Sequence, residues 1–380
     1  MKILHLSDLH LGKRLYNFSL IEDQKHILER ILEITAEESP EAVIIAGDIY
    51  DKPFPPAEAV TLFDDFLVKL SGLCADIFVI SGNHDSAARI AFGGRLMERS
   101  GVHISPIYSG SVNPVVLRDS FGEATFWLLP FIKPGEVRRF FPDETIESYT
   151  DAVSAAIKGM NIDASCRNVL VSHQFVTGAS ISDSEEHTVG GLDNVDASVF
   201  ADFDYVALGH IHSPQNIRCE GTLLRYCGTP LKYSYSEKDQ VKSVTVAELR
   251  EKGELSVREI PLMPLRDLIE IRGDYNTLVS KKFYEGLDTQ SFVHAVLTDE
   301  DEVFEAMAKL RTVYPNITSL NYDNSRTRRS NIGEIMTGTD KRSPLELFMD
   351  FYRLQNNNEM TESQIKLADD LIERIWEEAK

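Results

Sequence analysis

The stretch that decides the fold is AVIIAGDIYD, residues 42–51. Its first half is a run of five apolar residues, which is typical of a buried strand. Its second half opens with Gly47-Asp48, a turn that would bring a carboxylate to the end of that strand. Two further stretches, KILHLSDLH (2–10) and IFVISGNHD (77–85), have the same order of an apolar strand and then polar residues. Together they predict several strands of one sheet with a polar edge.

Helical patterns lie between these strands. Residues 21–36 and 57–70 carry apolar residues at helical spacing. Strand–helix–strand alternation predicts an α/β core. Helices become sparser after residue 100, so we expect part of the sheet to be antiparallel. The later strands are predicted at Thr125–Leu129, Val169–Val171, Tyr205–Leu208 and Val244–Leu249.

The composition shifts near Pro261–Pro264, after which a compact alternating pattern predicts a small second α/β domain. Its strands are expected at Leu268–Arg272, Phe292–Leu297 and Ile317–Tyr322, and its helices near Asn276–Tyr284 and Glu302–Val313. We therefore divide the chain into a first domain (1–260), a small domain (261–323), a linker (324–342) and a helical segment (343–380). The linker is rich in Ser, Thr, Gly and Asn and locally basic at Arg326, Arg328 and Arg329.

The last segment predicts two amphipathic helices. Each opens with a capping-box pattern, at Ser343–Glu346 and at Thr361–Gln364. Two roles are open for the apolar faces of these helices: docking on a partner's coiled coil, or packing on the chain's own small domain. The sequence favours neither role. The apolar positions are Leu345, Phe348, Phe351 and Tyr352 in the first helix, and Ile365, Ala368, Ile372, Ile375 and Trp376 in the second.

Composition excludes several classes of protein. A chain of 380 residues predicts two or more domains. No apolar run approaches the roughly 18 residues of a membrane span, and the N-terminus does not read as a signal peptide, so we expect a cytoplasmic protein without membrane attachment. Four scattered cysteines without a C-x-x-C pair argue against a disulfide scaffold or a cysteine zinc site. The net charge of −21 argues against nonspecific coating of nucleic acid, but it does not exclude a nuclease.

Five short segments hold the residues that suggest chemistry. The first three follow predicted strands, and loops at the carboxyl ends of strands in an α/β sheet converge on one crevice. Singly, each segment is more often an ordinary turn or a surface loop. Five of them in order are hard to obtain by accident, so jointly they favour a site. The segments are DLH (8–10), GDIYD (47–51), GNHD (82–85), SHQ (172–174) and GHIH (209–212).

The residue types of these segments fit two divalent metal ions. Asp and His suit Mn, Fe or Zn better than Ca, and a carboxylate can bridge two ions roughly 3.5–4 Å apart. Asp48 is the natural bridge, and Asn83 would add a neutral oxygen. Alternation along the chain would place His210 and His212 on one face of an extended segment.

His84 does not need to bind metal. Its imidazole could protonate the leaving oxygen of a phosphate ester, with Asp51 orienting the ring.

As a set, these motifs resemble the signature of the calcineurin-like metallophosphoesterases over roughly residues 1–235. Three more segments resemble the Mre/SbcD nuclease family within that superfamily: PFIKP (130–134), YCGTP (226–230) and SYSE (234–237). The resemblance implies a four-layer α/β fold, with a β-sandwich flanked by helices, followed by a small capping domain that faces DNA and by C-terminal helices.

The same resemblance implies roles for individual residues. One metal ion, manganese by analogy, would be held by Asp8, His10, Asp48 and His212. The second would be held by Asp48, Asn83, His173 and His210. His84 would be the catalytic histidine; some relatives carry His where this chain has Asp51.

The family also implies partners. Its members work with SbcC, an ABC-type ATPase with a long coiled coil, as a homodimer within a heterotetramer. The implied activities are an ATP-stimulated 3′–5′ double-strand exonuclease and a single-strand endonuclease. They act on DNA ends and hairpins in repair, recombination and replication. This chain has no Walker-type phosphate loop, so ATP dependence would come from the ATPase.

Two other functions stay open from the residues alone. A phosphatase or other phosphodiesterase could use the same metal centre, although it would not require the small domain or the terminal helices. A scaffold that recruits a partner through its helices, with a vestigial metal site, is disfavoured by the intact set of ligands.

Overall fold

The computed structural model describes residues 1–180, 194–219, 221–325, 327, 343–356 and 359–378. The chain forms two compact units, Met1–Asp267 and Leu268–Lys380. Residues 261–267 belong to the first unit. In this segment Arg266 pairs with Asp23, with Arg266 Nε 3.0 Å from the buried carboxylate. Most of the linker predicted at 324–342 lies outside the described residues.

The first unit contains two six-stranded mixed sheets. In the first sheet four strands are parallel, and the two strands that close one side are antiparallel. In order across the sheet they are β14 (Leu255–Pro261), β13 (Ser243–Leu249), β1 (Lys2–Leu6), β4 (Ala42–Ala46), β5 (Asp76–Ile80) and β6 (Val102–Ile104).

The second sheet also has a parallel centre, with an antiparallel strand at each edge. In order across the sheet its strands are β11 (Gln215–Cys219), β12 (Thr222–Tyr226), β10 (Tyr205–Gly209), β9 (Arg167–His173), β8 (Gly122–Leu129) and β7 (Pro114–Asp119).

The two sheets pack face to face around an apolar core. Ile44 and Phe78 of the first sheet share this core with Phe126 and Val169 of the second. The rings of Phe78 and Phe126 stack with centroids 4.4 Å apart. Alternate residues of the central strands, such as Val43, point away from this core and are also fully buried. Both faces of the first sheet are therefore covered.

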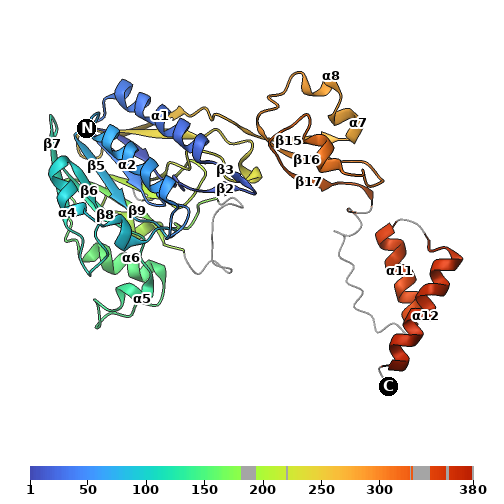
Figure 1. The fold of residues 1–380 in the computed structure, drawn as a ribbon. Coiled ribbons are helices and arrows are strands. Elements are labelled where there is room, and N and C mark those ends of the chain that lie inside the picture. The colour runs from blue at the N-terminus through green and yellow to red at the C-terminus, as the bar shows by residue number, and fades with distance from the viewer. Residues whose placement is uncertain (181–193, 220, 326, 328–342, 357–358, 379–380) are drawn as a thin grey trace. The chain divides into compact units, whose positions relative to one another are not determined.

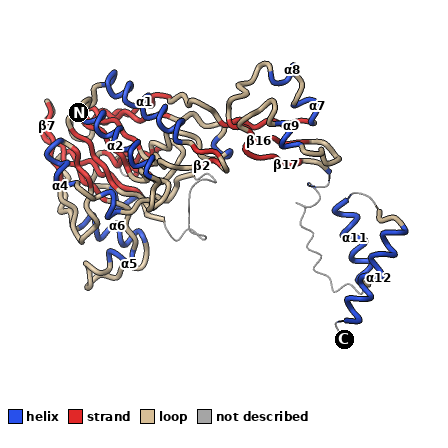
Figure 2. Tube along the Cα trace, viewed as in Figure 1, coloured by secondary structure: helices blue, strands red, loops and turns tan. Residues whose placement is uncertain are grey.

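Helices cover the outer faces of the sandwich (Figure 1). The helices α1 (Ile21–Glu38) and α2 (Ala57–Ser71) lie together on one side. On the other side, α6 (Tyr149–Lys158) packs Ala152 and Val153 onto the second sheet. The result is the helix–sheet–sheet–helix order of a four-layer α/β fold, and the strands lie inside it (Figure 2). The predicted fold class, with partly antiparallel sheets, is confirmed.

Shorter elements connect these layers. The hairpin of β2 (Arg14–Leu15) and β3 (Phe18–Ser19) follows the first polar segment. The short helices are α3 (Ala87–Ile90), α4 (Gly94–Met97) and α5 (Pro134–Val137), and the 3-10 turns are η1 (Glu98–Ser100), η2 (Ala197–Phe200) and η3 (Tyr235–Glu237).

The second unit begins with a parallel sheet of β15 (Leu268–Gly273), β16 (Phe292–Leu297) and β17 (Ile317–Tyr322). The predicted strands are thus present, but the predicted helices were too long. Asn276–Tyr284 is split into α7 (Tyr275–Leu278) and α8 (Lys281–Tyr284), with extended backbone at Ser280. In the segment 302–313 only α9 (Ala306–Leu310) is helical, because Glu305 has a left-handed backbone (φ 52°) that a right-handed helix cannot include.

The tail contains α11 (Pro344–Asn356) and α12 (Glu362–Glu378). At each predicted cap, the backbone N of the first residue donates to the side chain three residues on. Ser343 N donates to Glu346 Oε2 (2.7 Å), and Thr361 N donates to Gln364 Oε1 (2.8 Å). The two helices are joined by a bond from Gln364 Nε2 to Tyr352 Oη (3.1 Å). The side chains of Ile375 and Trp376 lie outside the described part of the tail.

Among the described residues, no helix combines the length and the apolar character needed to cross a membrane.

Candidate metal centre

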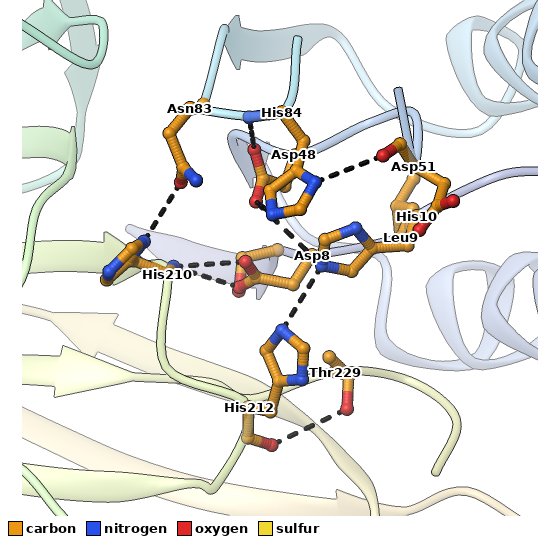
Figure 3. Close-up of polar contacts among 12 residues, drawn as sticks. Asp8, Leu9, His10, Asp48, Asp51, Asn83, His84, His210, His212 and Thr229 are labelled. Atoms are coloured by element: carbon orange, nitrogen blue, oxygen red, sulfur yellow. Dashed lines mark hydrogen bonds and ion pairs between the residues drawn. The ribbon is translucent and has the colours of Figure 1, made fainter. Parts of the chain in front are cut away.

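The five polar segments meet where parallel strands of both sheets end. Figure 3 shows residues of four of them, DLH, GDIYD, GNHD and GHIH. DLH follows β1, GDIYD follows β4 and GNHD lies just beyond β5, so the first sheet supplies three loops. In the second sheet β9 ends at His173 and β10 ends at Gly209, one residue before His210. Because β9 and β10 are parallel and pair His173 with Gly209, their ends lie side by side. The crevice predicted from strand order is therefore formed by both sheets rather than by one.

The backbone at this crevice is in an unusual conformation. Asp8, His10, Asp48 and His210 all have positive φ angles, of 52°, 43°, 48° and 96°. Such angles cost on the order of 1–3 kcal/mol each and persist where surrounding structure enforces them, often at functional sites. Two enforcing bonds run from Asp8 N to Gly47 O and from His10 N to Asp48 O, both 3.0 Å. The strain turns the side chains of neighbouring loops toward one point.

Two motif glycines are required by close approach. A Cβ on Gly82 would lie 2.1 Å from Asp48 Oδ1, and one on Gly47 would lie 2.4 Å from His173 Nδ1. Gly47 also has a φ of +86°, which favours glycine. The glycines of GDIYD and GNHD therefore leave room for the side chains of Asp48 and His173.

Asp8, His10 and His212 form the first cluster of possible ligands. Each offers an atom within 4.8 Å of the atoms of the others. The Nε2 atoms of His10 and His212 face each other at 3.2 Å. All three side chains are buried, so these nitrogens and the carboxylate converge on a small enclosed volume.

The second cluster contains Asn83, His173 and His210. Asn83 Oδ1 lies 3.0 Å from His173 Nε2 and 2.9 Å from His210 Nδ1. Asp48 lies between the two clusters. Its carboxylate is 3.4 Å from His173 Nε2 on one side and 3.8 Å from His10 Nε2 on the other. The structure thus brings all seven predicted metal ligands together.

The predicted arrangement of His210 and His212 was wrong in one respect. The segment is not extended, because β10 ends at Gly209 and the φ of His210 is +96°. The two imidazoles consequently do not share a face. His210 reaches Asn83, whereas His212 reaches His10.

His84 lies at the edge of the same centre. Its backbone N donates to Asp48 Oδ1 at 2.9 Å, and its Nε2 is 3.9 Å from Asp48 Oδ2. Its Nδ1 is 3.0 Å from the main-chain carbonyl of Asp51. The Asp51 carboxylate instead pairs with Lys13 Nζ at 2.7 Å. Asp51 therefore orients the ring through its backbone and not through the predicted side chain.

Burial of these groups changes their charges. Burial, opposed by His173 and reinforced by Asp48, raises the pKa of Asp8 to about 6. Burial would also raise the pKa of Asp48, but His173 and His10 hold it well below its usual range. Burial lowers the pKa of His210 to about 3 and that of His10 well below its usual value. For His173 burial is outweighed by Asp48 and Asp8, which raise the pKa to about 9.

The charges of the two carboxylates and of His10 and His210 fit divalent cations, whereas His173 would have to release its proton to bind one. Two buried carboxylates close together are costly unless positive charge compensates them. Neutral imidazoles, as burial favours at His10 and His210, are the form of histidine that binds metals. The donor set of carboxylate, imidazole and amide oxygen suits transition metal ions.

Comparisons with known proteins agree with this geometry. Residues 1–214 match the model of the calcineurin-like phosphoesterase family, and residues 264–356 match that of the type 5 capsule protein repressor C-terminal domain. The chain is 35% identical over 324 residues to the SbcD subunit of the nuclease SbcCD from Staphylococcus epidermidis, covering 84% of this chain and 85% of that protein. The chain belongs to the SbcD family of calcineurin-like phosphoesterases. The predicted family is therefore confirmed, and with it a metallophosphoesterase.

Two solved structures are also similar to this chain. The phosphopantetheinyl hydrolase PptH of Mycobacterium tuberculosis is 14% identical, with a TM-score of 0.37 over 68% of this chain and 95% of its own. A dimetal phosphatase of Danio rerio is 11% identical, with a TM-score of 0.41 over 68% and 95%.

Sequence reasoning assigned no role to Asp85, although it belongs to GNHD. Its buried carboxylate accepts bonds from the backbone N atoms of Ile49 (3.1 Å), Tyr50 (3.0 Å) and Gly82 (3.0 Å). Asp85 therefore clamps the loop after β4 to the loop after β5. The motif shows that a carboxylate is present at Asp85. It does not show that this carboxylate binds the backbone N atoms of Ile49 and Tyr50, more than 30 residues away.

Glu237 is a second residue that the sequence analysis left without a role. It is fully buried, with Oε1 3.6 Å from His212 Nδ1 and Oε2 2.5 Å from Lys242 Nζ. Burial would raise the pKa of Glu237, but His212 and Lys242 lower it to about 2, so the side chain is ionised. Lys242 Nζ also donates to the carbonyl of His212 at 2.9 Å. Glu237, beside Nδ1, and Lys242, at the carbonyl, therefore fix the orientation of His212, whose Nε2 faces His10.

We expect Glu237→Gln to weaken metal binding by about 10–100-fold, the usual effect of losing an outer-shell partner of a ligating histidine. The affinity for Mn²⁺ would be measured by calorimetric titration. Glu259→Gln is the matched control, because Glu259 pairs with Arg225 (2.6 Å) and does not contact a histidine of the site. Equal affinities of the two variants would show that Glu237 does not act through His212.

Proposed function

We propose that this chain is the nuclease subunit of an SbcCD-type complex and that its metal centre hydrolyses DNA phosphodiesters. The observation that carries the proposal is the convergence of Asp8, Asp48, Asn83 and the four histidines on one buried point, with His84 at its edge. The 35% identity to an SbcCD nuclease subunit over most of both chains favours DNA as the substrate.

We assign one ion to Asp8, His10, Asp48 and His212, and the other to Asp48, Asn83, His173 and His210. The distances from Asp48 to His10 and to His173 support its place as the shared ligand. We take the metal to be manganese, by analogy with the family. When bound, two such ions would polarise a phosphate and lower the pKa of water.

The remaining work falls to side chains of the protein. The carbonyl of Asp51 holds His84 Nδ1, so that Nε2 lies on the side of Asp48 and of the two clusters. A proton on Nε2 can pass to the leaving oxygen while Nδ1 donates to the carbonyl. Lys13 holds the Asp51 carboxylate, which keeps the loop after β4 in place beneath His84.

The small domain is proposed to cap this site and to face DNA. Its residues 261–323 carry more acidic than basic side chains, so contacts to phosphates would be local. The adjacent Lys281 and Lys282 on α8 are both exposed and are the candidates.

A nuclease assay supplied with Mn²⁺ tests the proposal. The full chain, with and without its ATPase partner and ATP, would be given blunt duplex DNA, hairpin DNA and p-nitrophenyl phosphate. We expect DNA cleavage that requires Mn²⁺ and increases with the partner and ATP. Turnover of p-nitrophenyl phosphate without any cleavage of DNA would instead identify a phosphatase.

The tail helices are proposed to dock on the coiled coil of the ATPase. Leu347, Phe348 and Phe351 of α11 are exposed, as are Leu367 and Leu371 of α12. Apolar side chains at helical spacing on an exposed face are suited to binding another helix.

Removal of residues 343–380 should abolish association with the ATPase and leave metal binding unchanged. The double variant Phe348→Ala, Phe351→Ala should weaken association, because it removes two exposed aromatic rings. Asp350→Ala, an exposed position on the same helix, is the matched control. Co-purification of the truncated chain with the ATPase at the parental level would contradict the docking.

We also propose a homodimer. The first unit exposes large apolar side chains on and near α2, with Phe54 77% and Val68 65% exposed, and near α4, with Phe92 84% and Leu96 75% exposed. Arg89 lies 4.5 Å over the ring of Phe54, so the segments around α2 and α3 adjoin. Contiguous exposed apolar side chains mark interaction sites, and the contact with Arg89 brings Phe54 close to the segment that precedes Phe92.

A further inference from the structure

A cavity lies beside the metal centre. Its volume is about 430 Å³, within the range of about 300–1,000 Å³ typical of ligand pockets. Two segments line it: the β2–β3 hairpin with the residues before it, and the segment that leads into η3. We call it the tyrosine pocket, because Tyr16, Tyr233 and Tyr235 line it together with Lys13 and Arg14.

Tyr233 forms the wall between this pocket and the metal centre. Its ring packs edge-on against His10 (5.5 Å between centroids) and His212 (6.2 Å). Gln24 Nε2 lies 2.7 Å from the carbonyl of His10 and 3.4 Å from Tyr233 Oη, which fixes this wall. A molecule held at the metal centre would therefore have the tyrosine pocket as its immediate neighbour.

The pocket carries positive charge at its sides. Lys13 Nζ lies 5.5 Å from the centroid of the Tyr233 ring and pairs with Asp51, whose carbonyl holds His84. Arg14 donates to the carbonyl of Asn17, and none of the described carboxylates pairs with it. The guanidinium can therefore bind an anion such as a phosphate without first losing a carboxylate partner.

The pocket also has an exposed aromatic ring. Tyr16 is 58% exposed at the turn of the hairpin, with a left-handed backbone (φ 52°). The left-handed backbone at Tyr16 costs free energy. The ring recovers little of that free energy by packing, because most of the ring lies in solvent. Aromatic rings beside cations are the combination that binds single-stranded nucleic acid, through stacking on bases and contacts to phosphates.

We propose that the tyrosine pocket holds the unpaired nucleotide next to the scissile phosphate, with its base against Tyr16 and a flanking phosphate at Arg14. This inference rests on the proposed nuclease function and adds to it a binding position for one unpaired base. A base paired within a duplex has both faces covered by its neighbours and cannot enter the pocket. The pocket consequently selects single-stranded or frayed DNA at the point of cleavage.

The test determines whether the ring of Tyr16 stacks on one particular base of the substrate. A single-stranded phosphorothioate oligonucleotide that resists cleavage is bound to the full chain with Mn²⁺, and affinity is read by fluorescence anisotropy. A single abasic nucleotide is moved along the strand, one position in each oligonucleotide. For the parental protein, affinity should fall by about tenfold at one position, the effect of losing a stacked base.

In Tyr16→Ala we expect the intact strand to bind about tenfold more weakly and the abasic effect at that position to disappear. Tyr16→Phe should restore both, because the ring remains. Phe121→Ala is the matched control, since Phe121 is 45% exposed at the turn between β7 and β8, away from the pocket. Thermal unfolding and metal content would show that each variant is folded.

The outcomes separate the pocket from the nuclease function. An abasic effect that is the same in Tyr16→Ala and in the parental protein at every position would overturn the pocket, while DNA cleavage by the parental protein would leave the proposed function standing. If the parental protein neither binds nor cleaves any DNA, the proposed function fails and the pocket with it. An equal affinity for blunt duplex and for single strands would also contradict the selection of unpaired nucleotides.

Discussion

Asp48→Asn should lose DNA cleavage and most of its metal. The substitution keeps the shape of the side chain but removes the charge that lies between the two clusters, 3.4 Å from His173 and 3.8 Å from His10. We expect the affinity for Mn²⁺ to fall by more than the roughly 10–100-fold that follows loss of an outer-shell partner. Metal content after dialysis, measured by mass spectrometry, and the rate of cleavage of a labelled duplex would both be recorded.

Asp64→Asn is the control for this variant, because Asp64 is an exposed carboxylate on α2. It should keep the parental metal content and rate. The circular dichroism spectrum should be unchanged in both variants. Two equivalents of tightly bound metal in Asp48→Asn would show that Asp48 is not the shared ligand.

His84→Ala should retain metal and lose cleavage by about 10²–10⁴-fold, the usual contribution of a general acid or base. None of the seven predicted ligands is removed, so metal content should equal that of the parental protein. Cleavage of DNA would be measured in single-turnover reactions with a labelled oligonucleotide and saturating Mn²⁺.

A substrate with a different leaving group tests more directly whether His84 transfers a proton. The p-nitrophenolate of bis(p-nitrophenyl) phosphate departs without a proton, so the deficit of His84→Ala should be much smaller for this ester than for DNA. Added imidazole should restore part of the DNA cleavage. A deficit of equal size on both substrates, without rescue by imidazole, would mean that His84 positions other groups instead of transferring a proton.

Much of the fold was predictable from local pattern. Apolar runs such as residues 42–46 became central strands, because a strand buried on both faces needs apolar residues throughout. The bonds from the backbone N atoms of Ser343 and Thr361 were also predictable, since their partners lie three residues away. The predicted helix at Glu302–Val313 was too long, because nothing in its apolar spacing reveals the left-handed backbone of Glu305.

The sequence by itself determined which residues gather at the site. The first three motifs follow predicted strands, and strand ends of an α/β fold converge, so Asp8, Asp48 and Asn83 were identified without coordinates. Only the tertiary structure decided which atoms face one another. His10 meets His212 across 202 positions of the chain, the Asp51 carbonyl replaces its carboxylate at His84, and Glu237 stands behind His212. The physical reason is that periodicity and capping act over a few residues, whereas these contacts depend on the packing of two sheets.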